Sequence, residues 1–238
     1  MTETAALTAL VLFVAYLVRG VAGFGSGLIA IPLLTLLHPL PLVVPLVVLL
    51  DFLGSAAQGL RRRESISWPN LLPLLPFTVA GVLAALHLFA SVEPGRLETA
   101  LGVFVLVFAV YQVLPLPALR GSRLWAVPTG ALGGFVGTLF GTGGPFYMMY
   151  LQVRGLDKVA TRASFAAWFF VDGGLRLAGF AATGLLSVEL LGTLALWLVP
   201  AALGLFVGGA VHVGIDARTF KYFISLLLVF SGYRLLTG

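Results

Sequence analysis

Cysteine is missing from the sequence, and histidine is scarce. The chain has 238 residues, among them no cysteine and 3 histidines. Without cysteine there can be no disulfide framework, no thiolate catalysis and no cysteine-ligated zinc or iron-sulfur cluster. The histidines are scattered along the chain, which does not suggest a histidine-rich metal site. We therefore expect neither a metal ion nor a cofactor.

Charged residues are also few. They make up 10% of the sequence, whereas a typical soluble domain has about 25%. Hydrophobic residues make up 60%, and the mean hydropathy is +1.07. A soluble fold could not bury that much apolar surface. We therefore expect an all-α, polytopic membrane protein whose outer surface is solvated by the lipid bilayer.

The excess of positive charge has a simple explanation in such a protein. The net charge is +5 and the pI is near 10.0, but the basic residues form short clusters between apolar segments. The positive-inside rule places basic residues there, so nucleic acid is not an expected partner. The residues Met1–Thr4 lack the basic region of a cleavable signal, so the first apolar run is expected to be retained as a span.

Eight apolar segments follow one another with short connectors. A helix that crosses the bilayer needs about 20 residues. The first and fifth segments are about half as long again, and each contains a glycine cluster, so we expect broken or re-entrant helices there. The segments run approximately from Ala5 to Leu37, Leu40 to Gln58, Leu71 to Ala90, Leu97 to Leu114, Leu124 to Val153, Ser164 to Thr183, Leu190 to Val213 and Phe220 to Leu236.

Two sequence features recur at half the chain length. The glycine clusters Gly23–Gly27 and Gly141–Pro145 are about 120 residues apart. Asp51 and Asp172 have the same separation, and each is a lone acidic residue in the segment after its cluster. Internal repeats often define the architecture of transporters. We therefore expect two homologous halves of four segments each.

These halves are expected to comprise residues 1–116 and 117–238 of a single membrane domain. Eight plain crossings would place Arg61–Arg63 and Arg154–Arg162 on opposite sides of the membrane, against the positive-inside rule. If the two broken segments double back, the second half is inverted relative to the first and these connectors are all cytoplasmic. Many secondary transporters are inverted repeats, and we prefer this arrangement. The basic residues that would then face outwards are Arg96 and Arg234.

A glycine-rich break within an apolar segment predicts a polar chamber. Unpaired backbone groups in hydrocarbon cost several kcal/mol each, unless protein or a water-filled cavity satisfies them. Half-helices that restart near Leu28 and Phe146 would direct N–H groups and positive dipole ends towards the breaks. Ser26 and Thr142 could add hydroxyl donors. Two such ends converging near the midplane would suit a small oxyanion such as sulfite, a sulfonate or a carboxylate.

Other glycines have the spacing of packed helices. Gly133, Gly137 and Gly141 follow the small-xxx-small pattern, and so do Gly204 and Gly208. We expect these residues to permit close packing, whereas the two repeated clusters are expected to be functional breaks.

Asp51 and Asp172 lie deep in apolar sequence, where a charge is costly and usually functional. Either could carry a proton that couples transport to a proton gradient. For Asp172 a structural ion pair is an equal alternative, because Arg176 follows four residues later on the same helical face. Arg19 precedes the first break, where it could meet Asp51 or the solute, or reach the membrane interface. Arg19 and Arg176 are therefore candidate anion contacts.

Several aromatic residues lie near the second break in the sequence. Membrane aromatics more often face lipid or pack than act as gates, and we favour these two roles over gating. These residues are Tyr147, Tyr150, Trp168, Phe169 and Phe170.

The two clusters resemble the duplicated glycine-rich motif of the TauE/SafE sulfite exporter family, in the stretches Gly23–Leu34 and Gly141–Phe146. The resemblance covers essentially the whole chain. It implies a cytoplasmic-membrane permease that exports sulfite, sulfoacetate or related organosulfonates, with the breaks at the substrate site. Ser26 replaces a common glycine, and Tyr150 stands where the second copy would repeat Pro32, so the solute could differ. The matching residues are Gly23, Gly25, Gly27 and Pro32 in the first copy, and Gly141, Gly143, Gly144 and Pro145 in the second.

Other functions need to be weighed against transport. A membrane-embedded enzyme is not expected, because the sequence lacks an HExxH helix and paired aspartates at protease spacing, and Phe24 breaks the Gly-x-Ser-Gly pattern at Ser26. A cation or anion channel and a non-catalytic assembly subunit are the alternatives. Asp51 and Asp172 facing a pore would favour a cation channel, whereas a subunit would not need two polar breaks. The coupling ion, with protons as the candidate, and a homodimer are left open.

Overall fold

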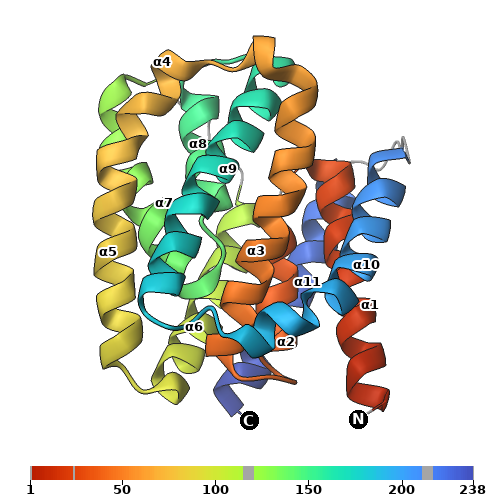
Figure 1. The fold of residues 1–238 in the computed structure, drawn as a ribbon. Coiled ribbons are helices and arrows are strands. Elements are labelled where there is room, and N and C mark those ends of the chain that lie inside the picture. The colour runs from red at the N-terminus through yellow and green to blue at the C-terminus, as the bar shows by residue number, and fades with distance from the viewer. Residues whose placement is uncertain (1, 24, 115–120, 211–216, 238) are drawn as a thin grey trace. The chain divides into compact units, whose positions relative to one another are not determined.

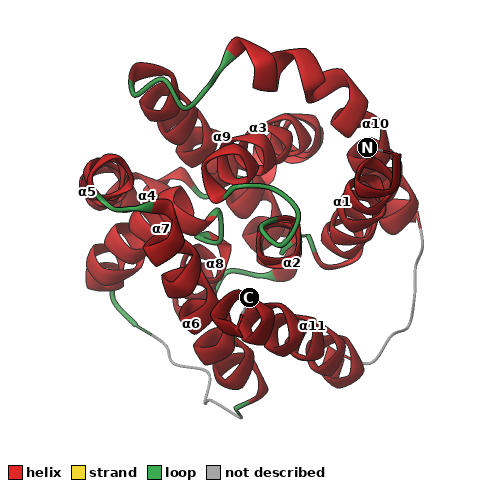
Figure 2. Ribbon diagram, turned by 90° about the horizontal axis from the view of Figure 1, so that it is seen from below, coloured by secondary structure: helices red, strands yellow, loops and turns green. Residues whose placement is uncertain are grey.

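The computed structural model describes residues 2–23, 25–114, 121–210 and 217–237, and all regular structure in these residues is helical (Figures 1 and 2). The all-α prediction is confirmed. The α-helices are α1 Thr2–Ala22, α2 Ser26–Leu34, α3 Leu40–Gly59, α4 Trp68–Leu71, α5 Leu75–Ser91, α6 Pro94–Val113, α7 Ala126–Phe140, α8 Gly144–Val153, α9 Lys158–Ala182, α10 Val188–Ala210 and α11 Ala217–Thr237, and the 3-10 helices are η1 Leu60–Ser65, η2 Leu72–Leu74 and η3 Arg123–Trp125.

Five helical stretches in the described residues are long and apolar enough to cross a membrane, which confirms a polytopic membrane protein. Helices α3 and α11 are also apolar over their fully described parts, Leu40–Ala56 and Ile224–Thr237. The fifth expected segment is divided between α7 and α8, and neither part has spanning length. The five stretches are Glu3–Ala22, Trp68–Ser91, Pro94–Val113, Lys158–Ala182 and Val188–Ala210.

The order of helices follows the same succession twice. A helix ends at a glycine cluster, a short helix of 9 or 10 residues comes next, and three longer helices complete the series. In this order α1, α2, α3, α5 and α6 correspond to α7, α8, α9, α10 and α11. The division into halves at residues 116 and 117 stays a prediction, and its boundary lies outside the described residues.

The chain forms two compact units, and each draws on both predicted halves. One unit comprises Met1–Val47, Val92–Leu116 and Val188–Gly238, and the other comprises Val48–Ser91 and Pro117–Ser187. In the first unit α1 packs along α10, and in the second α7 packs along α5. In the order of helices, α1 corresponds to α7 and α10 corresponds to α5. Each unit therefore pairs the same two kinds of helix, and in each pair one helix comes from the first predicted half and the other from the second.

Glycines bring the paired helices into backbone contact. In the first unit, a Cβ atom added at Gly204 would lie 2.2 Å from the Phe13 carbonyl oxygen, and one at Gly208 would lie 2.1 Å from that of Leu17. The packing role predicted for Gly204 and Gly208 is confirmed. Only glycine allows so close an approach of two backbones, which favours association of helices in a membrane.

The α5–α7 pair uses glycines in the same way. A Cβ atom at Gly134 would lie 2.4 Å from the Thr78 carbonyl oxygen, and one at Gly130 would lie 3.0 Å from that of Leu74. Gly133 and Gly137, which the small-xxx-small pattern singled out, form a separate series three residues further along α7 and face Tyr147 and Arg176. The close packing expected of Gly133 is therefore made with α8 rather than with α5.

Helix α8 returns along α7 to the end at which α7 begins. The backbone N–H of Gly121, which precedes α7, donates to the carbonyl oxygen of Val153 at the end of α8 (3.1 Å). Near the turn, a Cβ atom on Gly143 would lie 2.3 Å from the Gly133 carbonyl oxygen. The segment Ala126–Val153 therefore enters and leaves at one end of its unit.

Candidate functional site

The first glycine cluster separates α1 from α2. Gly23 and Gly25 have φ angles of 87° and 100°, a left-handed conformation that is costly for residues with a side chain. Helix α2 begins at Ser26, with Gly25 as its N-cap, so the restart near Leu28 was expected two residues too late. The second residue of the cluster, Phe24, lies outside the described residues.

The second cluster separates α7 from α8. Gly141 has a φ of 60° and caps the C-terminus of α7, so it ends that helix. Helix α8 begins at Gly144, again two residues before the expected restart at Phe146. Pro145 lies in the first turn of α8, where a residue without an N–H is tolerated because that group has no acceptor within the helix.

Polar residues of the first break are buried. Arg19 and Ser26 are each 2% exposed, and Arg19 Nη1 donates to Ser26 Oγ at 3.4 Å. Arg19 therefore lies at the break rather than reaching an interface. Gly27 and Pro32 lie within α2 and are buried as well. The expected meeting of Arg19 with Asp51 stays a prediction.

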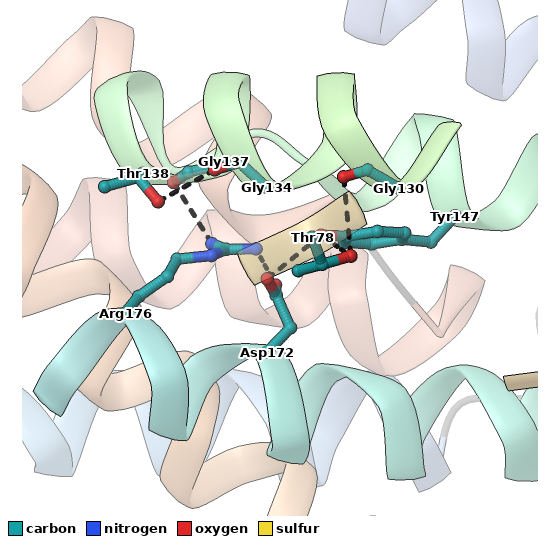
Figure 3. Close-up of polar contacts among 8 residues, drawn as sticks. All are labelled: Thr78, Gly130, Gly134, Gly137, Thr138, Tyr147, Asp172 and Arg176. Carbon is teal, nitrogen blue, oxygen red and sulfur yellow. Dashed lines mark hydrogen bonds and ion pairs between the residues drawn. The ribbon is translucent and has the colours of Figure 1, made fainter. Parts of the chain in front are cut away.

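The second break contains an ion pair between buried residues of α9 (Figure 3). Asp172 is fully buried and Arg176 is 2% exposed, and Arg176 Nη2 pairs with Asp172 Oδ2. Arg176 Nη1 also donates to the Gly137 carbonyl oxygen at 3.1 Å, and the Tyr147 hydroxyl donates to Asp172 Oδ1 at 3.0 Å. Both carboxylate oxygens are engaged, which a buried charge requires. The pairing predicted from the i,i+4 spacing is present.

Glycines make room for the Arg176 guanidinium beside the break. A Cβ atom at Gly137 would lie 2.6 Å from Arg176 Cζ, and one at Gly143 would lie 3.1 Å from Arg176 Nη2. Gly137 was expected to pack helices, but it accommodates this side chain. The guanidinium also lies 5.9 Å from the centre of the Phe169 ring. The cation is therefore positioned against the start of α8.

Two polar atoms at this break have no hydrogen-bond partner among the residues that the structure describes. They are Thr142 Oγ1 and Arg176 Nε, and both are buried. A buried hydroxyl or guanidinium N–H without a partner costs about 1–3 kcal/mol. Such groups are uncommon in folded proteins and call for an explanation. Here both belong to residues that border the turn from α7 to α8.

Aromatic residues near the second break pack together, as expected. Tyr147 lies edge-on to Trp168 and Phe169, with ring centres 5.8 and 6.3 Å apart. Phe170 stacks on Phe52 at 4.5 Å. Tyr150 is fully buried in α8.

Sequence reasoning missed several residues that hold Tyr147 in place. A Cβ atom at Gly133 would lie 2.5 Å from the Tyr147 ring. The Tyr147 hydroxyl also approaches Thr78 Oγ1 at 3.5 Å, and Thr78 in turn approaches the Gly130 carbonyl oxygen at 3.4 Å (Figure 3). The small-xxx-small spacing of Gly130 and Gly134 could have indicated the α5 contact, whereas no sequence signal pointed to Thr78.

The predicted site residues fall into two groups, one in each compact unit. Asp51, which is 6% exposed in α3, belongs with the second group. In the described part of the chain, no three histidine, aspartate or glutamate residues are placed to hold a metal ion. The first group is Arg19, Gly23, Gly25, Ser26, Gly27 and Pro32, and the second is Asp51, Gly141, Thr142, Gly143, Gly144, Pro145, Asp172 and Arg176.

Comparison with known proteins identifies a family. The family model described as Sulfite exporter TauE/SafE matches residues 8–235, which is nearly the whole chain. Searches of curated proteins and of solved structures found no match. The proteins of this family are membrane transporters rather than enzymes. With its interrupted helices and buried cation, the chain belongs to the sulfite exporter TauE/SafE family.

Proposed function

We propose that the protein is a secondary transporter that exports a small organic or sulfur-containing anion, such as sulfite, sulfoacetate or a related organosulfonate, across the cytoplasmic membrane. The observation that carries this proposal is the buried Arg176 guanidinium beside the second break, whose Nε has no hydrogen-bond partner in the described residues. An oxyanion is the natural ligand of a guanidinium, since its oxygens match the planar set of N–H donors.

The start of α8 adds to the attraction for an anion. The first N–H groups of a helix have no acceptor within it, and the helix dipole places partial positive charge there. Thr142 Oγ1, which is buried and lacks a partner, precedes this helix by two residues. We therefore assign the anion to Arg176, Thr142 and the start of α8 at Gly144, where Pro145 has no N–H and that of Phe146 donates to the Gly143 carbonyl oxygen.

The first break offers similar groups. Arg19 and Ser26 are buried at the start of α2, as Arg176 and Thr142 are at the start of α8. We propose that the first break also contributes anion-binding groups, since many secondary transporters bind their solutes at interrupted helices.

An inverted repeat is supported by the course of α7 and α8. Arg123 precedes this pair and Arg154 follows it, and Arg154 Nη1 donates to the Gly121 carbonyl oxygen at 2.6 Å. Arg154 Nε also donates to Asn70 Oδ1 at 2.9 Å, which places the connector that follows Arg63 at the same end of the unit. Three basic connectors thus meet at one end of this unit, and the positive-inside rule makes that end cytoplasmic.

Asp172 and Asp51 are the proposed coupling residues. Asp51 is buried in α3 within the same unit as Arg176, and Asp172 is paired with Arg176. An anion that binds Arg176 would break its ion pair with Asp172. The buried Asp172 carboxylate would then lack a counter-ion, and this favours binding of a proton to it. In this proposal the anion and the proton occupy the site together.

Efflux from liposomes tests the proposal. The purified protein is reconstituted into vesicles loaded with sulfite or sulfoacetate, and we expect saturable, pH-dependent efflux that Arg176→Gln abolishes. The matched control is Arg96→Gln, because Arg96 is an exposed residue whose side chain is 81% accessible. Efflux that does not saturate would favour a channel. Silence towards every anion, or full activity of Arg176→Gln, would refute the assignment.

Asp172→Asn separates coupling from binding in the same vesicles. If Asp172 carries the proton, this variant loses the pH dependence of efflux. Retention of full proton-dependent transport would remove Asp172 from the coupling role and leave Asp51 as the candidate.

A further inference from the structure

A groove lies at the end of the second unit where α5, α7 and α8 meet. Its volume is about 690 Å³. Most of its wall is apolar and includes Pro73, Phe77 and Val127, whereas Arg123 and Arg154 supply positive charge. The groove lies away from the Asp172–Arg176 pair, and the transport proposal does not use it. An apolar channel with two cations is complementary to an amphiphile with an anionic head.

The two arginines differ in how firmly they are held. Arg154 is fixed by its bonds to Asn70 and to the Gly121 carbonyl oxygen. Arg123 is exposed at the start of η3. In the described residues neither arginine forms an ion pair with a carboxylate. Their positive charge is therefore available to a ligand.

Exposed residues around the groove indicate its depth in the membrane. Trp68 and Trp125 are 46% and 40% exposed, and Leu72 and Leu124 are 59% and 76% exposed. Tryptophan gathers at the boundary between hydrocarbon and headgroups. Large apolar residues with this much exposure require lipid rather than water around them. The groove is therefore at the level where phospholipid headgroups lie.

We propose that this groove binds an anionic phospholipid. The lipid phosphate lies between Arg123 and Arg154, and an acyl chain lies along Phe77 and Val127. Basic pockets between transmembrane helices on the cytoplasmic side recognise anionic headgroups in this way. A zwitterionic lipid binds less well, because its ammonium group is repelled by the same two arginines. The inference holds whatever solute the protein transports.

Native mass spectrometry of the full-length protein in detergent tests this site. We expect the wild type to bind phosphatidylglycerol in preference to phosphatidylcholine. Arg123→Gln should reduce that preference about fivefold, which corresponds to about 1 kcal/mol for one basic residue at the membrane surface. Arg123→Lys should retain most of it, because the charge remains. Arg154 is left unchanged, since its bonds also hold the α7–α8 hairpin together.

Arg96→Gln is the matched control, because it removes an exposed arginine far from the groove in the sequence. It should leave the preference for phosphatidylglycerol unchanged. An equal loss with Arg96→Gln would show that general surface charge is responsible, and this would overturn the proposal. Full displacement of the lipid by inorganic phosphate at equal concentration would also overturn it, since the ligand would then be a free anion.

Discussion

The Asp172–Arg176 pair concentrates two opposite charges where almost no solvent reaches them. Removing one partner of a buried pair costs about 3–5 kcal/mol, whereas replacing both with apolar residues of similar size is often nearly neutral. We expect Asp172→Leu alone to lower the unfolding midpoint in detergent strongly. The double variant Asp172→Leu, Arg176→Met should recover most of the loss yet fail to transport. A double variant as unstable as the single one would contradict this account.

Two tyrosines of α8 allow a matched test of the network around the pair. Tyr147 and Tyr150 are both fully buried, but the Tyr147 hydroxyl donates to Asp172, whereas that of Tyr150 has no partner in the described residues. Tyr147→Phe should therefore cost about 1.5–3 kcal/mol, the range for a hydrogen bond to a charged group. Tyr150→Phe should be neutral or slightly stabilising. Chemical denaturation of both variants measures the difference, and equal losses would refute the assigned bond.

At the scale of residues, the sequence predicted the ion pair but not its surroundings. The i,i+4 spacing of Asp172 and Arg176 is a local property that a helix converts directly into contact. Thr78 and Tyr147 approach one another across 69 residues of sequence. Such a contact depends on which helices pack together, and hydropathy alone does not determine that.

Close packing of α1 with α10 makes a prediction at the scale of helices. Adjacent glycines of α10 have opposite environments, because a Cβ atom at Gly208 would lie 2.1 Å from the Leu17 carbonyl oxygen, whereas one at Gly209 would have no atom within 4 Å. Gly208→Ala should separate the helices and cost about 1–3 kcal/mol. Gly209→Ala should change stability by less than about 0.5 kcal/mol. Thermal unfolding in detergent measures both, and similar midpoints would contradict the packing.

The sequence predicted most helices but few of their partners. Apolar length identified the spans, and glycine clusters located both interruptions, although each short helix begins two residues earlier than expected. The pairing of α5 with α7 was not predicted, because both helices are strongly apolar and the spacing of Gly130 and Gly134 does not name a partner helix. The small-xxx-small pattern was recognised in α7 at Gly133 and Gly137, but the glycines that contact α5 are Gly130 and Gly134, a parallel pair three residues earlier.

At the scale of the whole molecule, pairing between the predicted halves is the main organising feature. Each compact unit is built on exchanged helix pairs, which are α1 with α10 and α6 with α11 in the first unit and α7 with α5 in the second. Neither half can therefore form its closest helix contacts from its own segments. This exchange explains why the predicted boundary between residues 116 and 117 does not separate two independently packed bodies.

The membrane topology follows from the basic connectors and can be tested because the chain has no native cysteine. An inverted repeat requires Glu64 and Lys158 to lie on the cytoplasmic side, and Arg96 and Glu189 to lie outside. Single cysteines at these four exposed positions should react with a membrane-impermeant maleimide from intact cells only at positions 96 and 189. Positions 64 and 158 should react after the membrane is opened.

The decisive comparison is between position 64, which follows α3, and position 158, at the start of the corresponding helix α9. A parallel repeat with eight crossings would place positions 64 and 158 on opposite sides of the membrane, because each broken segment would then cross the membrane once. The return of α8 to the start of α7 places the connectors around Arg154 and Asn70 at one end of their unit. Labelling of either position from intact cells would therefore exclude the cytoplasmic assignment of these connectors, and labelling of one alone would exclude the inverted repeat.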